Sequence, residues 1–154
     1  MGSGWSTVVF TLTMKRFSPR VIQVLASMIT VLATSVAAGE NAEWTPIFNG
    51  KDLSGWSPKF TGEPYGVNYL DTFSVEDGRL VASYDQYESF DDRFGHLFYH
   101  QKLSHFRLRL EYRFVGEQVP GAPSWAFRNS GIKFHSQAPQ RLPKDQRLLV
   151  AIET

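Results

Sequence analysis

The stretch FRLRLEYRF at residues 106–114 constrains the fold more than any other part of the chain. Phe, Leu and Tyr occupy every second position, and Arg and Glu occupy the positions between them. This period of two predicts a β-strand with one face on a core and the other in water. A sheet with one solvated face is typically antiparallel. We therefore expect an antiparallel sheet.

The segment FSVEDGRLVA at residues 73–82 predicts a tight hairpin in the same kind of sheet. Asp77 and Gly78 supply a two-residue turn in which both residues adopt positive φ. The predicted opposite pairs are Phe73 with Ala82, Val75 with Leu80, and Glu76 with Arg79. The opposite charges of Glu76 and Arg79 are expected to attract each other across the strands.

Further short strands are predicted at residues 96–99, 132–135 and 148–153, with loops rich in Pro or Gly between some of them. No helical periodicity of useful length occurs from Trp44 onward, and aromatic residues make up 14% of the chain. These features predict an all-β sandwich. The last strand ends at the chain terminus, so we expect an exposed apolar edge and an incomplete domain.

The amino-terminal region has the pattern of a secretory signal peptide over residues 1–38. Basic residues begin at Met14-Lys15-Arg16, residues 21–38 carry no charge, and small residues around Ala37 and Ala38 resemble a cleavage site. Met14 is an alternative start. The pattern predicts a secreted or periplasmic protein, and an uncleaved membrane anchor remains the alternative.

The composition excludes several functional classes. The net charge is +1 with no long basic run, so nucleic acid is not an expected partner. The chain has no cysteine, which excludes disulfides, thiolate metal sites and a cysteine nucleophile. It also lacks a Gly-rich phosphate loop, an H-E-x-x-H zinc motif and a G-x-S-x-G elbow.

The segment FNGKDLSGW at residues 48–56 resembles the opening signature of the 3-keto-disaccharide hydrolase domain family. Other matching segments are DTFSVEDGRL, RFGHLF, FRLRLEY and WAFRNSGI, which begin at residues 71, 93, 106 and 125. The resemblance implies a concanavalin A-like jelly-roll sandwich that is exported and acts on sugars oxidised at carbon 3. Relatives continue beyond Glu153, so residues 44–154 are expected to form the N-terminal part of such a domain.

The implied chemistry starts from the ketone at carbon 3, which makes the proton on carbon 2 acidic. A general base that removes this proton drives elimination of the group at carbon 1, and water can add later. The site also needs an electrophile near the ketone oxygen, which a divalent metal ion could provide. The substrate, and the expected partner of the chain, is a carbohydrate.

Two residues are candidates for proton transfer. Glu153 lies in the apolar segment LLVAIE, and His135 alternates with Ile132 and Phe134 and is expected to face away from them. The alternative for both is a solvent-facing position without a catalytic role. His96 and His100 are weaker candidates.

The segment RNSG at residues 128–131 invites a hydrogen-bonding role. Arg128 and Asn129 offer donors and an acceptor that suit vicinal hydroxyls, and Trp125 could stack on a sugar ring. Ser130 and Gly131 are expected to stabilise the turn, with Gly131 taking the difficult dihedral angles. Asn49 and Asp52 are expected to cap backbone groups, and Trp56 to pack in the core or a turn.

Three functional hypotheses follow. The first is an exported glycoside-cleaving enzyme domain, of hydrolase or lyase type, that acts on 3-keto-glycosides. The second is a carbohydrate-binding module without catalysis, because the jelly-roll fold serves lectins and enzymes alike. The third is an inactive truncated fragment.

Overall fold

The computed structural model describes residues 7–16 and 43–153. In these ranges the regular elements are β-strands and short 3-10 helices, without an α-helix. In chain order they are β1 (Thr7–Arg16), β2 (Thr45–Pro46), β3 (Trp56–Phe60), η1 (Tyr69–Asp71), β4 (Phe73–Glu76), β5 (Arg79–Ala82), β6 (Gly95–Tyr99), β7 (Phe106–Val115), η2 (Ser124–Ala126), β8 (Lys133–Phe134), η3 (Pro139–Arg141) and β9 (Ile152–Glu153).

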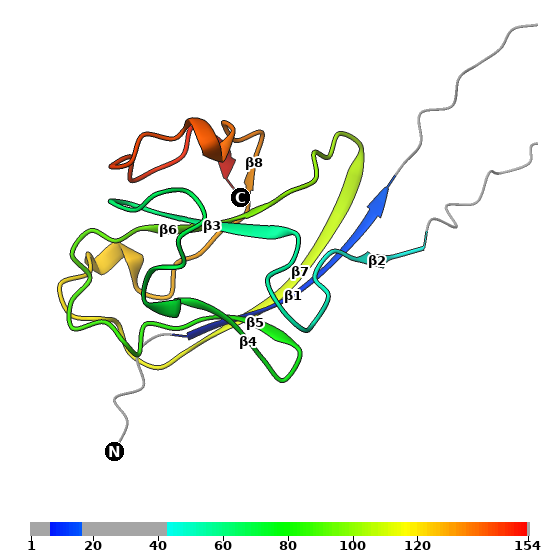
Figure 1. Cartoon of the computed structure of the whole chain (residues 1–154). Helices are drawn as coiled ribbons and strands as arrows, with labels where there is room; N and C mark the ends of the chain where they lie inside the picture. Colours follow the sequence, from blue (N-terminus) through cyan, green and yellow to red (C-terminus); the bar gives the residue numbers. More distant parts are fainter. Residues whose placement is uncertain (1–6, 17–42, 154) are drawn as a thin grey trace, which may run out of the picture.

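The main sheet is built around β1. This strand pairs antiparallel with β7 over ten residues, from Thr7 opposite Val115 to Arg16 opposite Phe106. It also pairs antiparallel with β5 and β2, and β4 completes the sheet beyond β5 (Figure 1). The strand at residues 106–114 is therefore confirmed and is one residue longer than predicted.

β1 was not among the predicted strands. Every second residue from Val8 to Met14 is apolar, which is itself a strand pattern. The basic residues that follow Met14 favour a leader instead. The uncharged segment 21–38 lies outside the described residues.

The hairpin of β4 and β5 has the predicted register. Phe73 lies opposite Ala82, and Asp77 and Gly78 have φ angles of 48° and 75°, as the two-residue turn requires. Glu76 lies opposite Arg79, as predicted. The Arg79 guanidinium forms its ion pair with the turn residue Asp77, at 2.8 Å.

Two small antiparallel sheets complete the strands. β3 and β6 pair over five residues, and β6 confirms the predicted strand at residues 96–99. β8 and β9 have two residues each, so the predicted strands at 132–135 and 148–153 were too long. The backbone N–H of Gln137 donates to the Val150 carbonyl, and the Gln137 side chain accepts from the Val150 N–H. At residue 150 these two hydrogen bonds take the place of the regular backbone pairing that a longer β8–β9 sheet would have.

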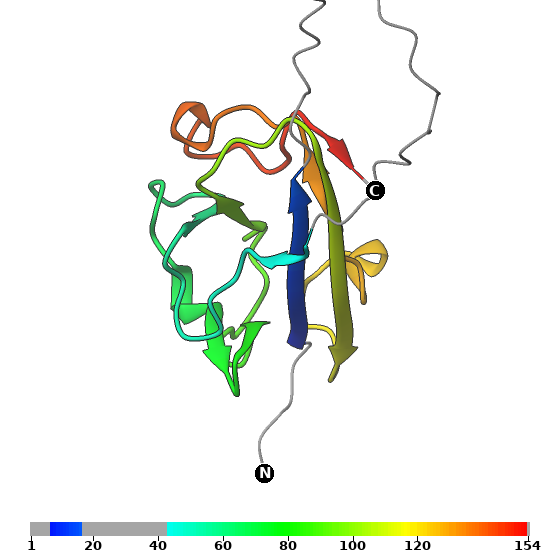
Figure 2. The same cartoon turned by 90° about the vertical axis from the view of Figure 1, so that its right-hand side faces the viewer.

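The predicted apolar edge at the end of the chain is exposed. The exposed fractions of Leu148, Val150 and Ile152 are 57%, 73% and 60%. Figures 1 and 2 show the β3–β6 pair lying apart from the main sheet, with the segment that carries β8, η3 and β9 at one end of the molecule. The fold is thus all-β, with antiparallel sheets arranged as in a β-sandwich.

The core combines buried apolar residues with a few fully bonded polar groups. Phe60 is fully buried, and Leu80 and Val81 are nearly so. Burial raises the pKa of Tyr87 to about 12, and its hydroxyl bonds Thr72 Oγ1 at 2.7 Å. Within the described ranges, no helix is long and apolar enough to cross a membrane.

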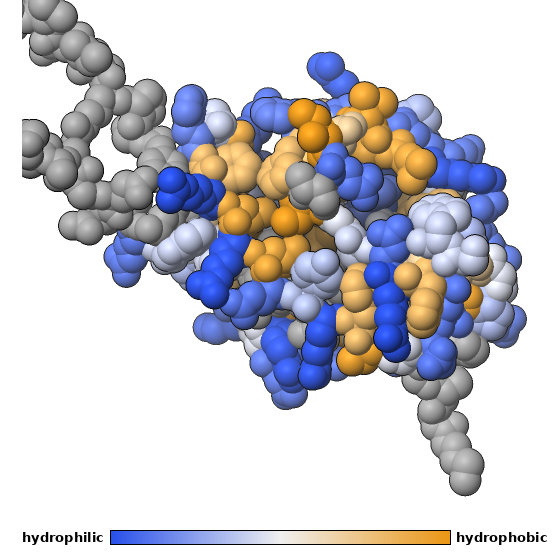
Figure 3. All heavy atoms as spheres, turned by 180° about the vertical axis from the view of Figure 1, so that it is seen from behind, coloured by the Kyte–Doolittle hydropathy of each residue, from blue (hydrophilic) through white to orange (hydrophobic). Residues whose placement is uncertain are grey.

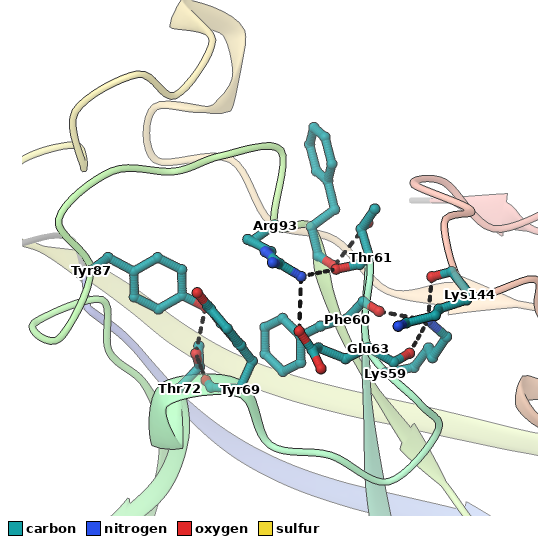
Figure 4. Close-up of polar contacts among 10 residues, drawn as sticks. Lys59, Phe60, Thr61, Glu63, Tyr69, Thr72, Tyr87, Arg93 and Lys144 are labelled. Carbon is teal, nitrogen blue, oxygen red and sulfur yellow. Dashed lines mark hydrogen bonds and ion pairs between the residues drawn. The ribbon is translucent and has the colours of Figure 1, made fainter.

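Buried Lys59 connects β3 to the loop before β9. Its ammonium donates to the carbonyls of Phe60, Glu63 and Lys144 at 2.5, 2.8 and 2.9 Å (Figure 4). Burial lowers the pKa of Lys59, while Asp145 and Glu63 act in the opposite direction. All three ammonium protons are therefore used to hold backbone in place.

Candidate functional site

A groove of about 1080 Å³ lies between the inner face of β7, strand β6 and the segment that contains β8. Its wall is mixed, with aromatic and aliphatic side chains beside polar ones. A smaller hollow of about 470 Å³ shares much of this wall, at the β8–β9 pair. Seen from behind, the molecule shows hydrophobic patches next to hydrophilic residues (Figure 3). Residues of the larger groove with polar side chains include Ser57, His96, His100, Ser130, Lys133, His135 and Gln137.

The candidate base Glu153 is paired with a lysine. In the β8–β9 register Lys133 lies opposite Glu153, and the Lys133 ammonium donates to the Glu153 carboxylate. The Lys133 side chain is 18% exposed and lines the groove, whereas the Glu153 side chain is 53% exposed and is not among the lining residues. Glu153 is therefore at the margin of the groove, held there by Lys133.

His135 follows β8 and lines both hollows. Strict alternation predicted that it would face away from Ile132 and Phe134, but all three residues line the smaller hollow. The reason is the backbone at His135, where φ is 51° and the extended conformation ends. The imidazole is on an exposed residue, accessible to a ligand in the groove.

His96 lies near the ion pair of Lys133 and Glu153, although it is far from both residues in the sequence. Its Nε2–H donates to the Arg147 carbonyl at 3.1 Å, and it lines the same groove as Lys133. Burial lowers the pKa of His96; the bond to Arg147 raises it, Lys133 lowers it and Glu153 raises it. The structure thus brings three polar residues from separate segments together. Nothing in the sequence around residue 96 indicates this proximity, because it depends on how β6 packs against the β8–β9 segment.

His100, which directly follows β6, is engaged locally. Its Nε2 shares a hydrogen bond of 2.7 Å with the Ser57 hydroxyl. Both residues line the groove. This pair adds hydroxyl-binding capacity to the wall.

The predicted sugar-binding residues lie outside the lining of the groove. Trp125 is 59% exposed and its ring is stacked on Phe94, with centroids 5.8 Å apart and planes 5° apart. The Arg128 guanidinium lies over the Phe127 ring, and the Asn129 side-chain amide donates to the Trp125 carbonyl at 3.1 Å. The structure does not bring these residues together with Glu153 and His135.

The RNSG turn differs from the prediction in one respect. Arg128 takes positive φ, at 51°, and Gly131 does not. Ser130 and Gly131 line the groove instead. The difficult dihedral angles thus fall at the start of the turn, where the Arg128 side chain is directed to Phe127.

The opening signature forms a closed hydrogen-bonded turn. Asn49 Oδ1 accepts from the backbone N–H of Lys51 and Asp52, and Asp52 accepts from Asn49 Nδ2 and the Ser54 N–H. Hydrogen bonds from Ser54 and Asn49 lower the pKa of Asp52 to about 2. The indole N–H of Trp56 donates to the Ile47 carbonyl at 3.2 Å. The structural roles predicted for Asn49, Asp52 and Trp56 are confirmed.

The described residues do not offer a site for the divalent ion that the resemblance suggested. Three or more His, Asp or Glu side chains never gather closely enough in the described ranges to hold a metal. The Glu153 carboxylate is paired with a lysine, and His96 donates to a backbone carbonyl. The donor set near the groove therefore does not fit a metal ion.

Comparison with known proteins agrees with this architecture. Residues 43–152 match the family described as the 3-keto-alpha-glucoside-1,2-lyase-like domain, and this range is most of the 154-residue chain. Searches of curated proteins and of solved structures each returned no significant match. The turn at Asn49, the hairpin, β7 and the RNSG segment all lie within the matched range. The chain therefore belongs to the 3-keto-alpha-glucoside-1,2-lyase-like family, a family of glycoside-acting domains.

Proposed function

We propose that this protein is an exported enzyme domain that cleaves 3-keto-glycosides. The observation that carries the proposal is the groove of about 1080 Å³, whose wall holds His96, Lys133 and His135, with Glu153 bonded to Lys133. A carboxylate, an ammonium group and imidazoles are the groups that elimination beside a ketone needs. Family membership supports a glycoside substrate.

In the proposed reaction Glu153 takes the proton from carbon 2 of the 3-keto sugar. The electron pair of the broken C–H bond first delocalises onto the ketone oxygen as an enolate. When the enolate collapses, the C1=C2 double bond forms, the ketone is restored and the C1–O bond breaks. His135 gives a proton to the departing oxygen, and Lys133 offers an ammonium group for the negative charge on the ketone oxygen. Addition of water to the double bond then yields the free 3-keto sugar, so that elimination and hydrolysis share the first step.

The test is incubation of the full chain with a 3-keto-glucoside, followed by chromatography for 3-keto-glucose or its unsaturated precursor. Wild type is expected to form product. Glu153→Gln and His135→Ala are expected to lower kcat about 100-fold or more, which is the usual contribution of a positioned acid or base. Glu88→Gln and His105→Ala are matched controls, because neither residue lines the groove or lies in the segment from β8 to β9 that carries Lys133, His135 and Glu153.

Deuterium exchange separates the two steps of this reaction. In heavy water, nuclear magnetic resonance is expected to show exchange at carbon 2 with His135→Ala but not with Glu153→Gln. Full product formation by both variants would refute the assignment of these residues while leaving the reaction itself intact. No product from wild type would refute the enzyme proposal.

A carbohydrate-binding role without catalysis is the second candidate, and the Trp125 ring favours it. One face of this ring is stacked on Phe94 and the residue is 59% exposed, so a flat aromatic surface is available to a sugar. In this case Arg128 and Asn129 are the neighbouring hydrogen-bonding groups. Calorimetric sugar binding that Trp125→Ala abolishes, with no product after prolonged incubation, would support this role over catalysis.

Export is also part of the proposal and rests on residues 14–38. Cleavage after Ala37 or Ala38 would separate β1 from the rest of the chain. The intact mass of the exported protein decides the matter, because it distinguishes a processed chain from an uncleaved, anchored one. A chain found in full and inside the cell would refute export.

A further inference from the structure

One face of the β3–β6 pair carries side chains that line the groove. In the register of this sheet Ser57 lies opposite Phe98, and the fully buried Phe60 projects from the other face. The His100 N–H donates to the Gly55 carbonyl at 2.9 Å, which extends the pairing by one residue. This places the His100 side chain on the same face as Phe98 and Ser57, and all three residues line the groove.

Three rings follow one another along this face. His96, Phe98 and His100 are two residues apart, so their side chains project to the same side. The His96 and Phe98 rings are in contact, with centroids 6.4 Å apart. At a rise of about 3.3 Å per residue, the row is about 13 Å long, which is more than one sugar ring occupies. It begins near the ion pair of Lys133 and Glu153, and its far end therefore has room for a second ring.

The far end of the row presents a hydrogen-bonding pair. The Ser57 hydroxyl and His100 Nε2 share a bond of 2.7 Å, and these side chains make no other hydrogen bond to the residues that the structure describes. If Ser57 donates, its oxygen can still accept and the His100 Nδ1–H can donate. If the imidazole donates, the hydroxyl can still donate and Nδ1 can accept. Either neutral tautomer thus offers a donor and an acceptor side by side, which suits vicinal sugar hydroxyls.

We propose that Ser57, Phe98 and His100 bind the group that departs from carbon 1, and that this group is a second sugar. The inference rests on the proposed function, in which the ketone-bearing ring lies at the other end of the row, beside Lys133 and Glu153. The second ring then lies along the row, where the Phe98 ring offers an apolar surface and the Ser57–His100 pair binds hydroxyls. These residues determine which glycoside binds and do not touch the reacting bonds.

The test is calorimetric binding of two sugars to the full chain with Glu153→Gln, which prevents turnover. Methyl 3-keto-α-glucoside has one ring, whereas maltose with the ketone on its non-reducing ring has two, and both are alpha-glucosides like the compound in the family description. Ser57→Ala and His100→Ala in this background are each expected to raise the Kd of the keto-maltose about five- to tenfold, through loss of a hydrogen bond. The Kd of the methyl glycoside is expected to rise less than about twofold. His100→Asn, which keeps a donor and an acceptor, is expected to recover part of the affinity.

Ser104 and His105 provide a matched control pair. Their side chains also share a hydrogen bond, of 3.1 Å, but neither residue lines the groove. Ser104→Ala and His105→Ala are expected to leave both Kd values unchanged, and circular dichroism checks that each variant is folded. Equal weakening of both sugars, unweakened binding of the keto-maltose, or no binding of either sugar before Ser57 or His100 is changed would overturn the proposal.

Product formation by the wild-type chain separates this failure from failure of the proposed reaction. If product forms but the variants do not discriminate between the two sugars, the reaction stands and the second-sugar subsite is refuted. If the variants weaken the keto-maltose selectively but wild type forms no product, the subsite is supported and the reaction is refuted.

Discussion

Lys133 and Glu153 lie opposite each other on β8 and β9, and their side chains form an ion pair. Twenty residues separate them in the chain. The pair places a carboxylate beside the candidate groove, and the ammonium lines that groove. A surface ion pair of this kind contributes little to stability, so its position beside the groove is more informative than its energy.

The two residues are expected to act together in the proposed reaction. Lys133→Met should lower kcat/KM, because the ammonium both holds Glu153 and offers a positive charge to the ketone oxygen. The double variant with Glu153→Gln should lose less than the sum of the two single losses, because the positioning role of the lysine disappears with the base. Steady-state kinetics of the four proteins measures this, and strictly additive losses would show that the two residues act independently.

His96 is expected to make stability dependent on pH in mild acid. Its pKa is below 6.5 in the folded chain, because of burial, and returns to the ordinary value on unfolding. The unfolded chain therefore binds a proton more readily as the pH falls below about 6.5. The contribution of His96 to the free energy of unfolding therefore decreases as the pH falls below about 6.5. It becomes constant once the pH is below the pKa of His96 in the folded chain.

Urea unfolding at a series of pH values measures how steeply the free energy of unfolding changes with pH. His96→Gln, which retains an N–H donor for the Arg147 carbonyl, is expected to flatten this dependence. His105→Gln is the matched control, because His105 is exposed and its ring contacts the neighbouring Ser104 hydroxyl. An unchanged slope in His96→Gln would contradict the prediction.

Removal of the Lys59 ammonium is expected to be strongly destabilising. Lys59→Ala leaves three carbonyls, on Phe60, Glu63 and Lys144, without this donor in a buried site and also opens a cavity. The expected loss is about 3 kcal/mol or more. Lys59→Met fills most of the volume, so the part of the loss that remains in this variant measures the hydrogen bonds. Chemical denaturation gives the values, and exposed Lys51→Ala should change stability by less than about 0.5 kcal/mol.

A side chain at Gly95 is expected to destabilise the fold. A Cβ at this position would lie 2.3 Å from Cε1 of the buried Phe60 ring, and φ at Gly95 is not positive, so the conflict is steric. Gly95→Ala should cost about 1–3 kcal/mol, as overpacking usually does. In the Phe60→Leu background the same change should cost less, which a double-mutant cycle of unfolding free energies tests. Equal costs in both backgrounds would show that Phe60 is not the obstacle.

Deletion of residues 1–16 is expected to destabilise the main sheet. β1 provides the partner for β7 and for part of β5, and its loss leaves both strands with unpaired edges. The truncated chain should show a lower Tm and a greater tendency to aggregate, measured by thermal unfolding and light scattering. A chain without residues 1–6, which keeps β1 whole, is the control. Equal Tm values for the two deletions would contradict the prediction.

The strands with the clearest local pattern could be predicted from the sequence. The alternation at residues 106–114 gave β7, and Asp77-Gly78 gave the β4–β5 hairpin with its register. In both cases the information is local: side chains alternate across a strand, and two adjacent residues determine the turn. The turn formed by Asn49 and Asp52 was predictable for the same reason, because its hydrogen bonds span three residues or fewer.

The tertiary structure decided the arrangements that depend on distant partners. β1 becomes the centre of the main sheet through pairing with a strand ninety or more residues away, and His96 approaches Lys133 and Glu153 because β6 packs beside their segment. The segment with Trp125, Arg128 and Asn129 comes just before the groove residue Ser130 in the sequence. Its side chains nevertheless contact Phe94, Phe127 and the Trp125 carbonyl and do not line the groove. The sequence by itself therefore determined the strand type, the hairpin and the family. Only the packing of segments far apart in the chain decided which polar side chains share the groove, because such contacts leave no periodic signal in either segment.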